Sequence, residues 1–158
     1  MTRRRVVVTG LGLVTPVGNN VQDSWSNLLA GQSGIQTITK FDASAFSCQF
    51  AGEVKGFNIE DYIPGKEARH MDTFIHFGLA ASMQAVRDAG LPTGDALTPE
   101  VAERIGVMVG SGIGGLPMIE QTHKDYIERG ARRISPFFVP ASIINMISGH
   151  VSIQFGFE

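Results

Sequence analysis

The feature that most constrains how this chain can fold is a short apolar run that ends in closely spaced glycines, Arg104–Gly115. Ile105–Val109 is apolar and rich in β-branched residues, which predicts a strand buried on both faces of a sheet covered by helices. The segment that follows, Gly110–Gly115, is called the glycine turn here. Its four glycines predict backbone with positive φ or backbone lying against another group. Leu116 and Pro117 then open a predicted helix. Because open α/β sheets bind ligands at the carboxyl ends of their strands, we expect a ligand site at this turn.

The composition fits one domain with a core and excludes several classes of partner. The chain has 158 residues, of which 43% are hydrophobic and 18% charged, and a net charge of -2. That charge provides no bulk attraction to nucleic acid or to a membrane surface. No apolar run approaches the length of roughly 18 residues that a membrane span needs. A single cysteine excludes a disulfide framework, so we expect a cytoplasmic protein.

The remaining pattern alternates predicted strands and helices, which indicates an α/β fold. Arg3–Gly12 is predicted to be a first strand. Asn20 is the expected N-cap of a helix that Gly31 ends, and Asp72 caps a long helix that runs to about Ala89. Small residues in that long helix, such as Gly78 and Ala85, would let it lie close on a sheet. We also expect a loop-rich insertion with a small hairpin over 32–65, a surface loop over 93–100 and an exposed helix over 118–128. A proline-punctuated segment over 134–140 is expected to be neither helix nor central strand. The last expected element is an apolar helix with Pro140 in its first turn.

The residues alone do not assemble a catalytic centre. The glycine turn formally matches the dinucleotide-binding pattern, but the acidic residue expected about twenty residues later is replaced by a basic, proline-broken stretch at 131–136. Cys48 is the only thiol, and no helix N-terminus or cation follows it to activate it. The four histidines show no metal-ligand spacing. Two small basic clusters stand out, and by themselves they read as solvated surface: Lys66 with Arg69, and Arg132 with Arg133.

Five motifs in order carry a resemblance to a known family: Val6–Gly12, Thr15–Gly18, Leu29–Gly34, Gly110–Gly115 and Ile134–Pro140. Together they resemble the amino-terminal portion of bacterial β-ketoacyl-acyl-carrier-protein synthases, the elongating condensing enzymes of fatty-acid synthesis, and most closely the synthase II type. The resemblance covers essentially the whole chain. It implies a partial thiolase-like fold, the amino-terminal part of the first of two α/β halves, and a homodimer in the intact protein.

The resemblance also implies a reaction and its partners. A cysteine would take the acyl chain from acyl carrier protein, and two histidines would support decarboxylation of malonyl-acyl carrier protein, so that the resulting carbanion attacks the acyl-enzyme. In the family the nucleophile and both histidines follow positions equivalent to Glu158. We therefore assign no catalytic residue within the 158 residues and give Cys48 no catalytic role. We interpret this chain as a fragment and expect it to be inactive alone. We expect no cofactor, metal, nucleic acid or membrane partner.

Six residues match functional positions of the family. Ile113 matches a residue that lines the acyl pocket and influences the chain length accepted, and Phe138 matches one that projects across the dimer interface toward that pocket. The two basic pairs match positions that dock the acidic acyl carrier protein, although His70 stands where relatives often have another cation.

Two alternatives from other classes remain open at this point. One is a non-catalytic ketosynthase-like chain-length factor, in which the nucleophile position does not hold cysteine. The other is a nucleotide-binding module that uses Gly110–Gly115.

Overall fold

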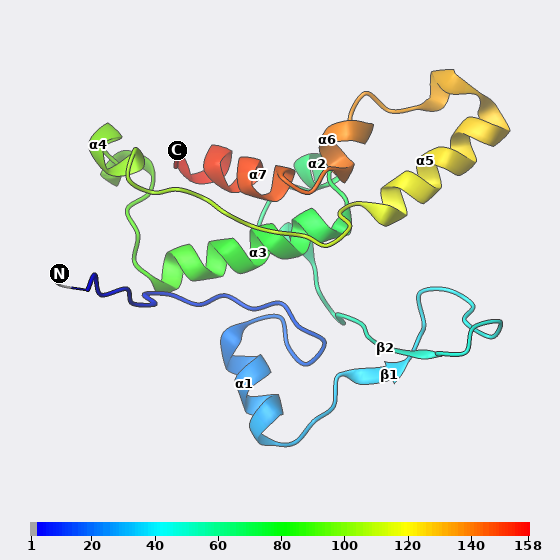
Figure 1. The fold of residues 1–158 in the computed structure, drawn as a ribbon, viewed down its shortest axis with the longest axis horizontal. Helices are drawn as coiled ribbons and strands as arrows, with labels where there is room; N and C mark the ends of the chain where they lie inside the picture. The colour runs from blue at the N-terminus through cyan, green and yellow to red at the C-terminus, as the bar shows by residue number, and fades with distance from the viewer. Residues whose placement is uncertain (1–2) are drawn as a thin grey trace. The chain divides into compact units, whose positions relative to one another are not determined.

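The computed structural model describes residues 3–158, in which helices predominate and one two-stranded sheet forms (Figure 1). Within these residues no helix is long and apolar enough to cross a bilayer. The elements are α1 Val21–Leu29, β1 Ile35–Thr37, β2 Phe50–Gly52, η1 Ile59–Asp61, α2 Gly65–Ala68, α3 Thr73–Asp88, η2 Gly94–Ala96, α4 Pro99–Ala102, α5 Leu116–Arg129, η3 Ala131–Arg133, α6 Phe138–Ser142 and α7 Met146–Phe155.

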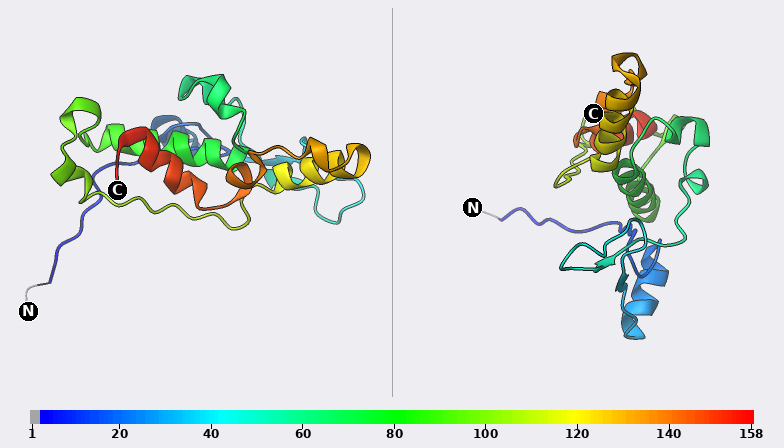
Figure 2. Two further views of the ribbon diagram at one scale, coloured as in Figure 1. Left: turned by 90° about the horizontal axis from the view of Figure 1, so that it is seen from above. Right: turned by 90° about the vertical axis from the view of Figure 1, so that its right-hand side faces the viewer.

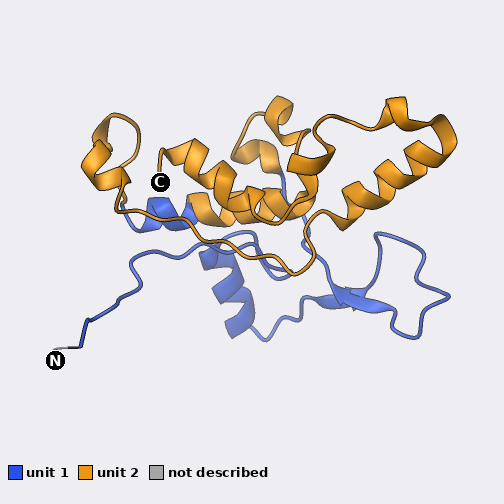
Figure 3. Ribbon diagram, turned by 45° about the horizontal axis from the view of Figure 1, so that its top comes forward, with its two compact units in different colours: residues 1–58, 84–90 blue, residues 59–83, 91–158 orange. Residues whose placement is uncertain are grey.

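The chain divides into two compact units (Figure 3). The first holds the residues up to Asn58 together with Gln84–Gly90, and the second holds Ile59–Met83 and Leu91–Glu158. All six residues predicted to have a role belong to the second unit.

The first helix of the first unit forms as predicted. The side chain of Asn20 accepts a hydrogen bond of 2.8 Å from the backbone N–H of Asp23 and so caps α1. Gly31 follows the end of the helix with a φ of +68°, a conformation that a side chain would disfavour.

The predicted strand over Arg3–Gly12 does not form: this segment is extended but pairs with no other strand among the described residues. Its anchor is the carboxyl-terminal part of α3. Leu11 donates its backbone N–H to the carboxylate of Asp88 at 2.8 Å, and Leu13 donates to the side chain of Gln84 at 3.2 Å. Side-chain acceptors therefore take the place of the backbone hydrogen bonds that a paired strand would supply. A β-strand forms only where the backbone of a neighbouring strand provides those bonds.

Between residues 32 and 65 the chain forms one small antiparallel pair. β1 and β2 are joined so that Ile35 lies opposite Gly52 and Thr37 opposite Phe50. Glu53, which follows β2, accepts hydrogen bonds from the hydroxyl of Thr39 at 2.6 Å and from its backbone N–H at 3.1 Å. These bonds favour the charged carboxylate and lower the pKa of Glu53. The limits of the insertion remain a prediction.

The core of the second unit lies between α3 and α7, which run side by side in Figures 1 and 2. Ile75 and Leu79 of α3 are buried there with Ile147 and Val151 of α7. Gly78 makes this approach possible, because a Cβ at that position would lie 2.5 Å from Cγ2 of Ile147. The small residue at 78 was predicted to admit a sheet, and it admits a helix instead.

Ile105–Val109 is not the strand buried on both faces that its composition predicts. Val107 and Val109 pack against the α3–α7 core, and the N–H of Val109 donates to the hydroxyl of Ser148 at 3.0 Å. Met108, pointing the other way, is 97% exposed. The segment is extended with one face covered and one bare, since no other described strand lies beside it.

The carboxyl-terminal region also departs from expectation. Phe138–Ser142 is a helix despite its proline, so the prediction that 134–140 is neither helix nor central strand is wrong over Phe138–Pro140. Pro140 belongs to this α6 and not to the last helix, because the extended backbone of Ile143 separates α6 from α7. The predicted surface loop over 93–100 includes η2 and the start of α4. The predicted exposed helix appears as α5, which has no buried residue.

Candidate functional site

The glycine turn is open at its start and tightly packed at its end. A Cβ at Gly110 or Gly112 would meet no atom within 4 Å. Gly114 has a φ of +83°, and its N–H donates to the hydroxyl of Ser111 at 3.1 Å. Gly115 is buried, and its N–H donates to the carbonyl of Ser142 at 2.9 Å. Ile113, held between these two halves of the turn, is 69% exposed.

Phe138 is joined to the same turn through the backbone of Ser142. It is the first residue of α6 and is half-buried. Its carbonyl accepts the hydroxyl of Ser142 at 2.8 Å, and the carbonyl of Ser142 in turn accepts the N–H of Gly115. The structure thus brings the segments that carry Ile113 and Phe138 into one hydrogen-bonded junction.

Asp72 is a member of this junction that the sequence predicted only as a helix cap. It is 6% exposed. One carboxylate oxygen accepts the N–H of Thr73 at the start of α3, and the other accepts the N–H of Met118 in the first turn of α5 at 2.8 Å. The signal for the second contact lies in α5 itself, because its N-cap, Gly115, has no side chain to cap the helix.

The four cations predicted to dock a carrier protein are exposed on two short elements. Lys66 and Arg69 lie on and just after α2, and Arg132 and Arg133 lie on η3 beside α5. Within residues 3–158 none of the four forms an ion pair. These charges are free to meet an acidic surface.

His70 connects the α2 region to the start of α6. Its ring stacks on that of Phe137, with centroids 4.0 Å apart and planes inclined by 27°. Phe137 immediately precedes Phe138, so the segment carrying Arg69 adjoins the segment carrying the predicted pocket residue.

Cys48 and the four histidines have no nucleophilic or metal-binding role in the sequence analysis. Cys48 is exposed and lies in an irregular stretch before β2, where its thiol donates to the carbonyl of Phe50 at 3.5 Å. In the part of the chain that the structure describes, no three His, Cys, Asp or Glu side chains gather to hold a metal ion. His150 of α7 is partly buried, which lowers the pKa of its imidazole, and the carboxylate of Glu67 opposes that shift.

The nucleotide-binding reading of the glycine turn is not favoured by the geometry. A dinucleotide would place its pyrophosphate at the N-terminus of the helix that follows the turn. In α5 the N–H of Met118 already holds the carboxylate of Asp72, and Pro117 has no N–H to offer. The helix start is therefore occupied by a negative group that would repel a phosphate.

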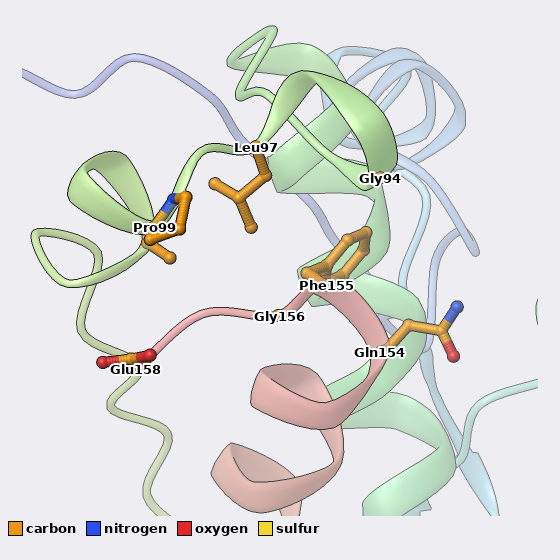
Figure 4. A pocket seen from close by; sticks show the side chains of 8 residues that line it. Gly94, Leu97, Pro99, Gln154, Phe155, Gly156 and Glu158 are labelled. Carbon is orange, nitrogen blue, oxygen red and sulfur yellow. The ribbon is translucent and has the colours of Figure 1, made fainter.

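A pocket of about 480 Å³ lies elsewhere in the second unit (Figure 4). Leu97 and Pro99 form one wall, and Phe155 and Gly156 at the end of α7 form the other. None of the six predicted site residues lines it.

Comparison of the sequence with known families and proteins gives concordant matches. Residues 3–158 match the model of the β-ketoacyl synthase N-terminal domain. Over 156 residues the chain is 56% identical to the 3-oxoacyl-[acyl-carrier-protein] synthase 2 of Vibrio cholerae, and over 153 residues it is 48% identical to that of Staphylococcus aureus. These alignments cover 99% and 97% of the chain but only 37% and 36% of the relatives, so the chain spans just over a third of their length.

Solved structures of ketosynthases match the fold. A structure of the ishigamide ketosynthase/chain length factor matches 97% of the chain with a TM-score of 0.77 and 26% identity. A structure of a ketosynthase in complex with its type II PKS acyl carrier protein matches 98% of the chain, with a TM-score of 0.77 and 28% identity. The chain covers 37% and 40% of those chains. The fold is therefore that of the amino-terminal part of thiolase-like ketosynthases.

Proposed function

This chain belongs to the β-ketoacyl synthase family, and from that premise we propose that it forms the amino-terminal part of a 3-oxoacyl-acyl-carrier-protein synthase of type II. The whole protein would join malonyl-acyl carrier protein to an acyl chain by decarboxylative Claisen condensation during fatty-acid elongation. It would act as an acyltransferase.

The observation that carries this proposal is the extent and level of the sequence similarity. Identity of 48–56% runs through 97–99% of the chain, and the proteins concerned share one name, 3-oxoacyl-[acyl-carrier-protein] synthase 2. The ketosynthases of solved structure share the fold at only 26–28% identity. The similarity therefore favours fatty-acid elongation over a chain-length factor.

In the proposed reaction this chain shapes the acyl site, while the nucleophile and the two histidines come from positions that the family places after Glu158. Ile113 would stand in the wall of the acyl pocket, and Phe138 would lie toward the pocket of a second subunit in a homodimer. At 69% exposed, the side chain of Ile113 is available to contact groups outside the described residues, as this role requires.

The partner we propose is acyl carrier protein, docked on Lys66, Arg69, Arg132 and Arg133. Their exposure and freedom from ion pairs within residues 3–158 support this role, and one structural relative is a ketosynthase in complex with its carrier. Such a carrier is acidic, so opposite charges would steer the encounter and orient it. The cytoplasm is the proposed location.

The test is condensation by the full-length protein that carries this sequence. Incubation with malonyl- and acyl-loaded carrier protein is expected to yield carbon dioxide and a 3-oxoacyl carrier in equal amounts. Cys48→Ser is expected to be as active as the wild type, because this thiol is exposed and bonded only to a backbone carbonyl. A protein that releases no carbon dioxide and forms no acyl-enzyme would instead be a chain-length factor.

A further inference from the structure

Three segments meet at the buried residue Asp72, namely the start of α3, the start of α5 and the end of α6. In the first turn of α5, Leu116 donates its N–H to the carbonyl of Gly114 at 3.0 Å, and Pro117 has none. The next N–H, that of Met118, has Asp72 as its acceptor. A helix start leaves such groups unsatisfied unless a cap supplies an acceptor. For α5 the cap comes from a residue 46 positions earlier in the chain.

Gly115 fits this arrangement because its lack of a side chain leaves room for the carboxylate. A Cβ there would lie 2.9 Å from the Oδ2 atom of Asp72 and 2.7 Å from the Cα of Ser142. Both distances are shorter than real Cβ contacts allow. A conventional serine or aspartate cap is thus excluded at Gly115, and the remote carboxylate takes its place.

The backbone of Asp72 also holds the end of α6. Its N–H donates to the carbonyl of Ala141 at 3.3 Å, while the next carbonyl, that of Ser142, accepts the N–H of Gly115. One residue therefore contacts the helix that follows Ile113 through its side chain and the helix that begins with Phe138 through its backbone.

We propose that Asp72 is a positioning residue of the acyl site, whose carboxylate sets the placement of Ile113 relative to α6 and so the acyl lengths that the site accepts. This inference rests on the proposed function for the identity of the substrate. Asp72 is buried behind the turn and acts through Gly115 and Met118.

The first test is Asp72→Asn in the full-length protein. Asparagine has nearly the same shape, but only one of its terminal atoms accepts hydrogen bonds, so one of the two N–H donors at Thr73 and Met118 loses its partner. We expect amide exchange at one of these residues to rise by about tenfold or more, as for a buried donor left unpaired. We also expect the ratio of kcat/KM for long over short acyl substrates to change by at least about threefold, as for a displaced positioning group.

A second variant and a matched control separate positioning from folding. Gly115→Ala keeps the charge of Asp72 but displaces it, and it is expected to shift the same ratio. The matched control is Asp88→Asn, at the end of α3. The carboxylate of Asp88 also accepts a backbone N–H, that of Leu11 at 2.8 Å. This substitution is expected to leave both the ratio and the exchange of Met118 unchanged.

The outcomes separate this inference from the proposed function. If exchange rises in the Asp72 variant while the ratio of kcat/KM keeps its wild-type value, Asp72 only caps the helices and the inference is overturned. If exchange at both amides stays at its wild-type rate, the carboxylate does not hold the turn, and the inference is overturned as well. A wild-type protein without condensation would overturn the proposed function and the acyl-length role together, while the exchange result would still report whether Asp72 fixes α5.

Discussion

At the scale of single residues, the helix caps of this chain differ in how far along the sequence their partners lie. Asn20 caps α1 and Gly31 adopts a positive φ after it, because both depend on neighbours within a few positions. Asp72 was predicted to cap α3, and it does contact that helix, but its bond to Met118 depends on tertiary folding and could not be read from spacing.

The role of Ile113 makes a residue-scale prediction. Ile113→Phe in the full-length protein is expected to lower kcat/KM for long acyl substrates at least about tenfold more than for short ones, because a larger side chain shortens the pocket. Steady-state kinetics with a series of acyl carriers measures this. Equal loss for all lengths would argue against a place in the pocket wall.

His150 makes a prediction about pH. Its imidazole has a lowered pKa in the folded protein, chiefly because it is partly buried, so folding favours the neutral ring. The resulting stabilisation is present above the ordinary value of 6.5 and is lost as the pH falls from there toward the folded value. We expect an NMR titration midpoint below 6.5 and a Tm that falls less between neutral and mildly acidic pH in His150→Gln than in the wild type. A midpoint at or above 6.5 would contradict the burial argument.

At the scale of elements, helices were predicted more successfully than strands. The pattern of 3.6 residues per turn is local, and α1, α3 and α5 lie close to their predicted limits. Arg3–Gly12 and Ile105–Val109 have the composition of strands but lack neighbours among the described residues, so no ladder forms. The docking elements α2 and η3 are too short for any periodic signal, and their cations drew attention only through family resemblance.

The basic residues of α2 carry the next prediction. Lys66→Glu with Arg69→Glu is expected to raise the KM for acyl carrier protein by about fivefold or more at low salt, because docking depends on opposite charges. Lys40→Glu with Lys55→Glu is the control with the same change in net charge, and it is expected to keep the wild-type KM. Equal effects of the two pairs of substitutions on KM would mean that net charge, and not a docking site on α2, determines the KM.

The contact between α3 and α7 can be tested with two glycines. Gly78→Ala places a methyl group against Ile147 and is expected to lower the free energy of unfolding by about 1–3 kcal/mol. A Cβ added at Gly149, inside α7, would meet no side chain closer than 3.8 Å, so Gly149→Ala is expected to raise stability by about 0.5–1 kcal/mol. Urea unfolding of the same protein measures both. A neutral Gly78→Ala would mean that the two helices separate easily at this point.

At the scale of the whole molecule, the two extended segments have bare edges. Val6 and Val8 are 91% and 80% exposed, and Met108 faces outward as well. Unpaired apolar edges attract further strands. The relatives are nearly three times as long as this chain, which leaves ample sequence to supply such strands.

We therefore predict that these segments become strands in the full-length protein. Amide exchange at Val7 and Met108 is expected to be rapid in the 158-residue chain expressed alone and slow in the longer protein, because ladder hydrogen bonds protect amides. Fast exchange in both proteins would show that the edges stay unpaired.

The junction at Asp72 also has a consequence for the order of events on the ribosome. Asp72 is synthesised about 70 residues before Ser142, a delay of about 4–14 s at roughly 5–20 residues per second. During that interval the helix α3 can form, but Asp72 at its start has neither the N–H of Met118 nor the carbonyl of Ala141 as a partner. In the nascent chain the carboxylate of Asp72 therefore lacks its Met118 partner until α5 has left the exit tunnel, and the N–H of Asp72 lacks its Ala141 partner until α6 has followed. A pause in translation just before that point would lengthen the exposure of the unfinished junction to chaperones and proteases.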